Sequence, residues 1–81
     1  KLFTVIIQQM AFTPAELYIN AGDTVLWINK DMVTHNITEE ATKGWSSPPL
    51  AAGQSWNMVV SKNTNYFCSL PPVMKGKLIL K

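Results

Sequence analysis

The sequence alternates apolar and polar residues with a period of two in several short segments. This alternation covers residues 24–29 and 55–61, and an apolar, strand-like run opens the chain at residues 2–9. Such a period is typical of β-strands with one buried face, and the Val, Ile, Thr and aromatic residues in these segments are those that strands favour. The three segments therefore predict β-strands.

Turn-forming residues separate the predicted strands. They cluster at residues 20–23, 43–44, 47–49, 52–53 and 62–65. Short strands at regular intervals, with no long helical pattern, predict an all-β sandwich or small barrel. Residues 14–18 could form one helical turn, which Pro14 and the β-rich surroundings disfavour. There is no internal repeat or linker, so we expect a single domain over residues 1–81.

Composition narrows the classes of protein. The chain has 81 residues, 47% of them hydrophobic and 15% charged, with a formal net charge of +2. It can build a core, and it is too short for a multidomain enzyme. The basic residues are seven scattered lysines, so no nucleic-acid partner is expected. No apolar run approaches the roughly 20 residues that a membrane span needs.

The chain contains one His and one Cys. One Cys cannot form an internal disulfide, and the two residues together are too few for a Cys/His zinc finger, which needs about four ligands. No acid/base pair or nucleophile triad is visible, so we do not expect an enzyme. The first residues lack the features of a signal peptide, which indicates a processed mature form or an excised domain.

Two sulfur-containing residues and the single His form a candidate metal site. Cys68 and Met74 lie six residues apart, on a loop between two strand-like runs, and His35 follows a predicted strand far upstream. Soft sulfur ligands combined with imidazole select copper, especially Cu(I). Taken one by one, however, a buried Cys, a core Met and a hydrogen-bonded His are equally ordinary structural residues. The spacing alone leaves both interpretations open.

Several longer segments resemble the cupredoxins, the blue-copper family of plastocyanin, amicyanin and azurin. The similar segments follow one another in order over nearly the whole chain: residues 12–31, 35–36, 50–56 and 66–76. The resemblance implies a Greek-key β-sandwich of about seven or eight strands, a copper cofactor and descent from an electron carrier. It also implies an extracytoplasmic location, periplasmic or secreted, and a redox or copper-handling protein partner.

The resemblance also assigns roles to individual residues. It implies that His35, Cys68 and Met74 are metal ligands, with Met74 the weak axial one, and that Asn36 ties the ligand loops together. The family's short loop reads Cys-x-x-His-x-x-Met, and Pro71 stands at the position of the second His. Proline has no side-chain donor atom. We therefore expect an incomplete type 1 copper site with one open coordination position.

Three interpretations remain at this point. The protein could bind copper at this incomplete site, weakly or in only one oxidation state. It could be a Cu(I) carrier or sensor, or a metal-free interaction module with a buried Cys68. The sequence is compatible with Pro71 as a natural residue and with Pro71 as an engineered replacement of a ligand.

Overall fold

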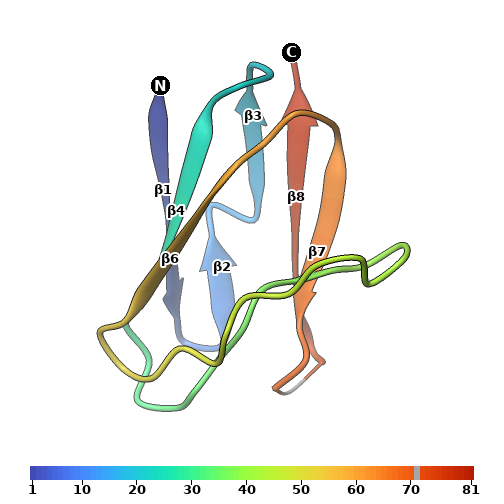
Figure 1. The fold of residues 1–81 in the computed structure, drawn as a ribbon. Helices are drawn as coiled ribbons and strands as arrows, with labels where there is room; N and C mark the ends of the chain where they lie inside the picture. The colour runs from blue at the N-terminus through green and yellow to red at the C-terminus, as the bar shows by residue number, and fades with distance from the viewer. Residues whose placement is uncertain (71) are drawn as a thin grey trace.

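Two four-stranded sheets face each other in the computed structural model, which describes residues 1–70 and 72–81 (Figure 1). The first sheet has the order β2-β1-β4-β6 and the second the order β3-β8-β7-β5. The strands are β1 (Leu2–Gln8), β2 (Ala11–Thr13), β3 (Glu16–Ile19), β4 (Thr24–Asn29), β5 (Thr38–Glu39), β6 (Ser55–Val59), β7 (Thr64–Cys68) and β8 (Met74–Leu80). The predicted Greek-key β-sandwich of seven or eight strands is confirmed.

The chain changes sheets at Pro14. β2 pairs with β1 in the first sheet, whereas β3, two residues further on, pairs in parallel with β8 in the second. This crossing closes one side of the sandwich. The helical turn considered for residues 14–18 is wrong: Glu16–Ile19 is a strand, because pairing with β8 and burial of Ile19 outweigh any local helical tendency.

The β7–β8 hairpin brings the ligand candidates of the last loop to one face of the sheet. In its antiparallel register Cys68 pairs with Met74, and Tyr66 pairs with Gly76. Directly opposed residues point to the same face. Tyr66, Cys68 and Met74 are all buried, so that face is the interior of the sandwich.

Aromatic residues from both sheets meet in the centre of the core. The Trp27 ring of β4 contacts the Tyr66 ring edge-on across the sandwich, with ring centroids 5.4 Å apart. Tyr66 also contacts Phe12, at 4.8 Å. The Tyr66 ring lies directly over Gly76, where an added Cβ would collide with it. Glycine at position 76 therefore leaves room for the largest side chain of the β7–β8 hairpin.

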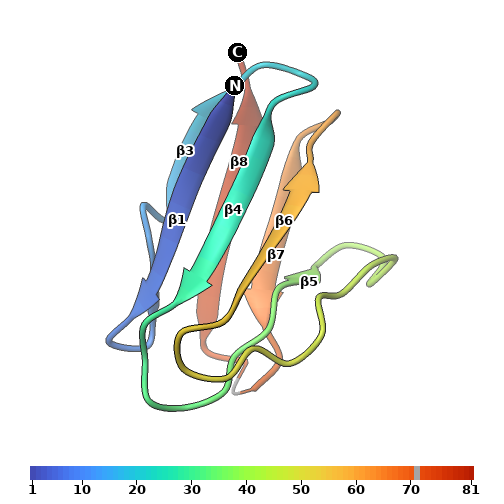
Figure 2. The same ribbon diagram turned by 60° about the vertical axis from the view of Figure 1, so that its left-hand side comes forward.

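The two ends of the sandwich differ. At one end lie both termini and the β3–β4 turn, in which Asp23 accepts hydrogen bonds from the amino terminus and from the backbone of Asn20. The other end carries the loop after β4 and the loop between β7 and β8 (Figures 1 and 2). The candidate ligands belong to this second end. No helix in the described residues is long and apolar enough to cross a membrane.

Replacing Gly76 with Ala tests the Tyr66 contact. The new methyl group must displace the Tyr66 ring from its place against Trp27, so we expect a loss of about 2 kcal/mol or more in the free energy of unfolding. Chemical denaturation measures it. Lys75→Ala, at the exposed neighbouring position of β8, is the control and should change stability little. Equal stability of Gly76→Ala and the parent would contradict this packing.

Candidate metal centre

His35 is held by the loop that follows β4. Its backbone forms an isolated bridge with Leu50, donating at 3.1 Å and accepting at 2.7 Å. The side chain of Asn29, the last residue of β4, donates to the carbonyl oxygens of Val33 and Leu50. These bonds fix both segments around His35, which is completely buried. The single imidazole of the chain is therefore a rigid interior group rather than a surface residue.

The structure brings His35 and Cys68 together. Cys68 Sγ lies 3.4 Å from His35 Nδ1, and both side chains are buried. Met74 is the cross-strand partner of Cys68 and is buried on the same face. With metal bonds of about 2.0 Å to imidazole nitrogen and about 2.3 Å to sulfur, one ion could bind both Nδ1 and Sγ after a small adjustment. Met74 begins β8, the strand that pairs with β7 at Cys68.

Asp31 holds the other nitrogen of the imidazole. His35 Nε2 lies 2.8 Å from Asp31 Oδ2. Because an ionised carboxylate can only accept, Nε2 carries the proton and the lone pair of the neutral ring is on Nδ1, facing Cys68. A hydrogen bond of this kind orients metal-binding histidines and sets their tautomer. The sequence analysis missed this role of Asp31, for which the only signal is its position four residues before His35.

The same carboxylate anchors the turn between β1 and β2. Asp31 accepts hydrogen bonds from the backbone N–H of Gln9 at 2.7 Å and of Met10 at 3.0 Å. Both turn residues have positive φ, 55° and 58°, which non-glycine residues rarely adopt. The Met10 bond, together with those from His35 and Gln9, lowers the pKa of Asp31. One carboxylate thus connects a strained turn to the buried imidazole.

Asn36 connects the two ligand-bearing segments. Its backbone N–H lies 3.4 Å from Cys68 Sγ, and the N–H of Leu70 lies 3.3 Å from the same sulfur. The Asn36 side chain accepts a hydrogen bond from the backbone N–H of Ser69 at 2.9 Å and donates one to Ser69 Oγ at 2.7 Å. Two N–H groups directed at one sulfur stabilise negative charge on it. The bonds to Ser69 fasten the chain just after Cys68 to the chain just after His35.

The predicted open position cannot be placed, because Pro71 lies outside the described residues. The donors around Cys68 can still be assessed. Within residues 1–70 and 72–81 no three His, Cys, Asp or Glu side chains surround one point. The available set is therefore one imidazole and one cysteine sulfur, with a thioether on the neighbouring strand. This mixture suits a soft ion such as copper and is unsuitable for calcium or magnesium.

Comparison with known proteins identifies a family of copper-binding proteins. Residues 2–81 match the family model described as copper binding proteins, plastocyanin/azurin family. Amicyanin of Paracoccus denitrificans is 30% identical over 84 residues, which cover 93% of this chain and 62% of that protein. Amicyanin-alpha of Methylorubrum extorquens is 29% identical and is covered to 68%. The chain spans about three fifths of the length of the Paracoccus amicyanins.

Solved structures show the same fold. A Cu(I) form of an amicyanin variant superposes with a TM-score of 0.90 at 27% identity, covering 99% of this chain and 82% of that one. The purple cupredoxin of Nitrosopumilus maritimus gives a TM-score of 0.85 at 29% identity, covering 96% of this chain and 98% of that one. The chain belongs to the plastocyanin/azurin family of copper-binding proteins.

Proposed function

We propose that this protein binds one copper ion through His35, Cys68 and Met74, at a type 1 site that lacks its second imidazole. The 3.4 Å approach of His35 Nδ1 to Cys68 Sγ carries this proposal. The hydrogen bond from Nε2 to Asp31 adds to it, because it leaves Nδ1 free to bind a metal. The 81 residues would act as one domain, related to electron carriers.

Each surrounding group has a defined task in this proposal. Bound copper would supply a one-electron couple between Cu(I) and Cu(II). Asp31 orients the imidazole, and the backbone N–H groups of Asn36 and Leu70 stabilise the thiolate. Complete burial of His35 and Cys68 excludes water from their side of the site. Two sulfur donors and one imidazole favour Cu(I) over Cu(II).

The missing ligand leaves one coordination position open. The side chain of proline at position 71 offers no donor atom, so Cu(II) would require water, chloride or an added imidazole there. Soft ligands and an open position also suit a protein that receives Cu(I) and passes it on. Transfer of copper to a competing chelator separates this second candidate function from electron transfer, in which the ion stays bound.

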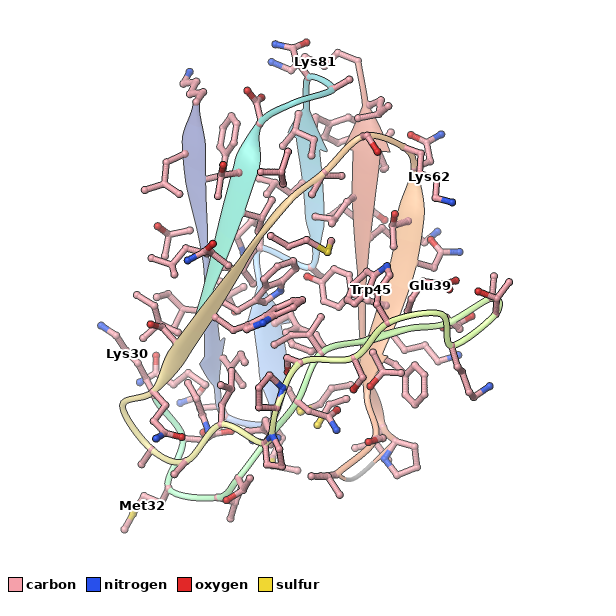
Figure 3. The ribbon with its side chains drawn as sticks, viewed as in Figure 1. Lys30, Met32, Glu39, Trp45, Lys62 and Lys81 are labelled. Carbon is pink, nitrogen blue, oxygen red and sulfur yellow. The ribbon has the colours of Figure 1, made fainter. Side chains whose placement is uncertain are left out.

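The end of the sandwich that carries the site also exposes apolar side chains. Met32, on the loop before His35, is 96% exposed, and its side chain extends away from the molecule (Figure 3). Val73, on the loop after Cys68, is 71% exposed. Exposed apolar groups on two loops at the same end of the molecule suit a transient protein contact. We expect a redox or copper-handling protein to dock at this end, in the periplasm or outside the cell.

Titration of the protein with Cu(I) under anaerobic conditions tests the ligand set. We expect one copper ion per chain and, at a free concentration about 100 times the Kd, an increase in Tm of about 10–20 °C, because the ion binds only the folded state. Cys68→Ser should abolish binding and Met74→Leu should weaken it. Met58→Leu, a half-buried control on β6, should leave it unchanged. Full binding by Cys68→Ser would refute the proposal.

The substitution Pro71→His tests the open position. A second imidazole at this point would complete the trigonal set, so the variant with Cu(II) should absorb strongly in the visible range through thiolate-to-copper charge transfer. The parent protein should absorb more weakly. Pro72→His places the same side chain one residue away and serves as the control. A colourless Pro71→His variant would show that the three ligands do not converge with position 71.

Asp31→Asn tests the orientation of the imidazole. The amide oxygen of asparagine can still accept a hydrogen bond from Nε2, but the side chain carries no charge. Its NH₂ group cannot accept from the backbone N–H groups of Gln9 and Met10, which now donate to Asp31. We expect copper affinity to fall about 10- to 100-fold. Asp23→Asn is the matched control, since Asp23 also accepts a backbone N–H but lies at the opposite end of the sandwich. It should lower stability without changing affinity. Equal copper affinities of both variants would exclude the role of Asp31.

A further inference from the structure

The four edge strands of the two sheets differ in how well they are protected from pairing with another chain. Three of them have a protective feature. β2 has only three residues and is followed by Pro14, and β3 carries the charged Glu16. β5 has only two residues, one of which is Glu39. Short strands, charges and prolines are the usual means by which proteins block sheet edges. β6, with the sequence Ser-Trp-Asn-Met-Val, has five residues and none of these features. It lies at the free edge of the first sheet (Figure 2).

The hydrogen-bond pattern shows which backbone groups of β6 are free. Gln54 and Val60, on either side of the strand, bond to Asn29 and Asp23 of the β4 segment. In an antiparallel pair the bonded residues alternate, so Trp56 and Met58 also bond to β4. The N–H and C=O groups of Ser55, Asn57 and Val59 therefore point away from the sheet. β6 has no second neighbouring strand in the described part of the chain.

We propose that β6 pairs antiparallel with β6 of a second copy of this chain, with the twofold axis at Asn57. In this register Asn57 faces Asn57 of the second copy, and Ser55 faces Val59. Ser55, Asn57 and Val59 of each copy then oppose one another with free backbone groups, which allows six hydrogen bonds between the two strands. The two four-stranded sheets become one continuous sheet of eight strands. The contact is isologous, so it closes as a dimer.

The charges near β6 agree with this arrangement. No charged residue occurs between residues 53 and 61, and the first one beyond the strand is Lys62. Antiparallel pairing about Asn57 places Lys62 opposite residue 52 of the second copy, which is Ala. The two Lys62 side chains then lie at opposite ends of the interface. A parallel arrangement would bring them side by side and is disfavoured by their repulsion.

Apolar surface beside the strand adds to the backbone contacts. Val59 is 63% exposed, and a groove of about 230 Å³ runs next to it between Trp45 and Lys62. The proposed register brings residues 52–54 of the second copy towards this groove. Five paired residues make a small interface, so the dimer should form at high protein concentration and dissociate on dilution. This inference does not depend on copper.

Sedimentation equilibrium over a wide concentration range tests the dimer. The average mass should rise from the 9.0 kDa of one chain towards twice that value. Asn57→Lys places two like charges across the twofold axis and should weaken association at least tenfold. Asn65→Lys, the same change at an exposed position of β7, is the control and should associate like the parent. A constant mass of 9.0 kDa in the millimolar range would overturn the proposal.

Amide hydrogen exchange of the unmodified protein tests the register itself. The N–H groups of Ser55, Asn57 and Val59 should gain protection as concentration increases. Those of Trp56 and Met58 already bond to β4 and should not change. Protection that appears on β3 instead, or unchanged association of Asn57→Lys, would show that another surface forms the contact.

Discussion

The register of the β7–β8 hairpin is the constraint on which both the core and the candidate site depend. It places Tyr66 over Gly76 and Cys68 opposite Met74 on the inner face of one sheet. A slip of one strand by one residue would turn one member of each pair outward, because side chains alternate between faces. Contact of Tyr66 with Trp27 of the other sheet holds this register. Packing in the core and the placement of Cys68 and Met74 on one buried face therefore have one origin.

Three separate loops supply the rest of the site, and two side chains connect them. Asp31 bonds the β1–β2 turn and the imidazole of His35. Asn36 bonds the segment after Cys68 to the segment after His35. The imidazole and the sulfur are thus held by groups that bind no metal themselves. Such preorganisation would let the proposed site keep its geometry with proline, rather than a second histidine, at position 71.

The alternation of apolar and polar residues was sufficient to predict strands that have one buried and one exposed face. The alternation at residues 24–29 corresponds to β4. The runs at 2–9 and 55–61 contain β1 and β6, which end one and two residues earlier than predicted. The strand after Pro14 was harder to predict. It forms by pairing with β8, a long-range contact that local residue propensities do not reveal. The fold class and the set His35, Cys68 and Met74 followed from resemblance more than from spacing.

Other features could not be read from the sequence at all. A carboxylate four residues before a histidine is common, so Asp31 became meaningful only when the 2.8 Å contact was seen. The unprotected edge of β6 depends on which of its backbone groups bond to β4, and alternation in the sequence does not determine this. Both features arise from the relative placement of distant segments.

X-ray absorption at the copper edge of the Cu(I)-loaded protein tests the central claim most directly. The ligand set predicts two sulfur scatterers, from Cys68 and Met74, and one imidazole nitrogen from His35. A first shell of oxygen and nitrogen alone would contradict it, because copper would then be bound somewhere other than beside Cys68.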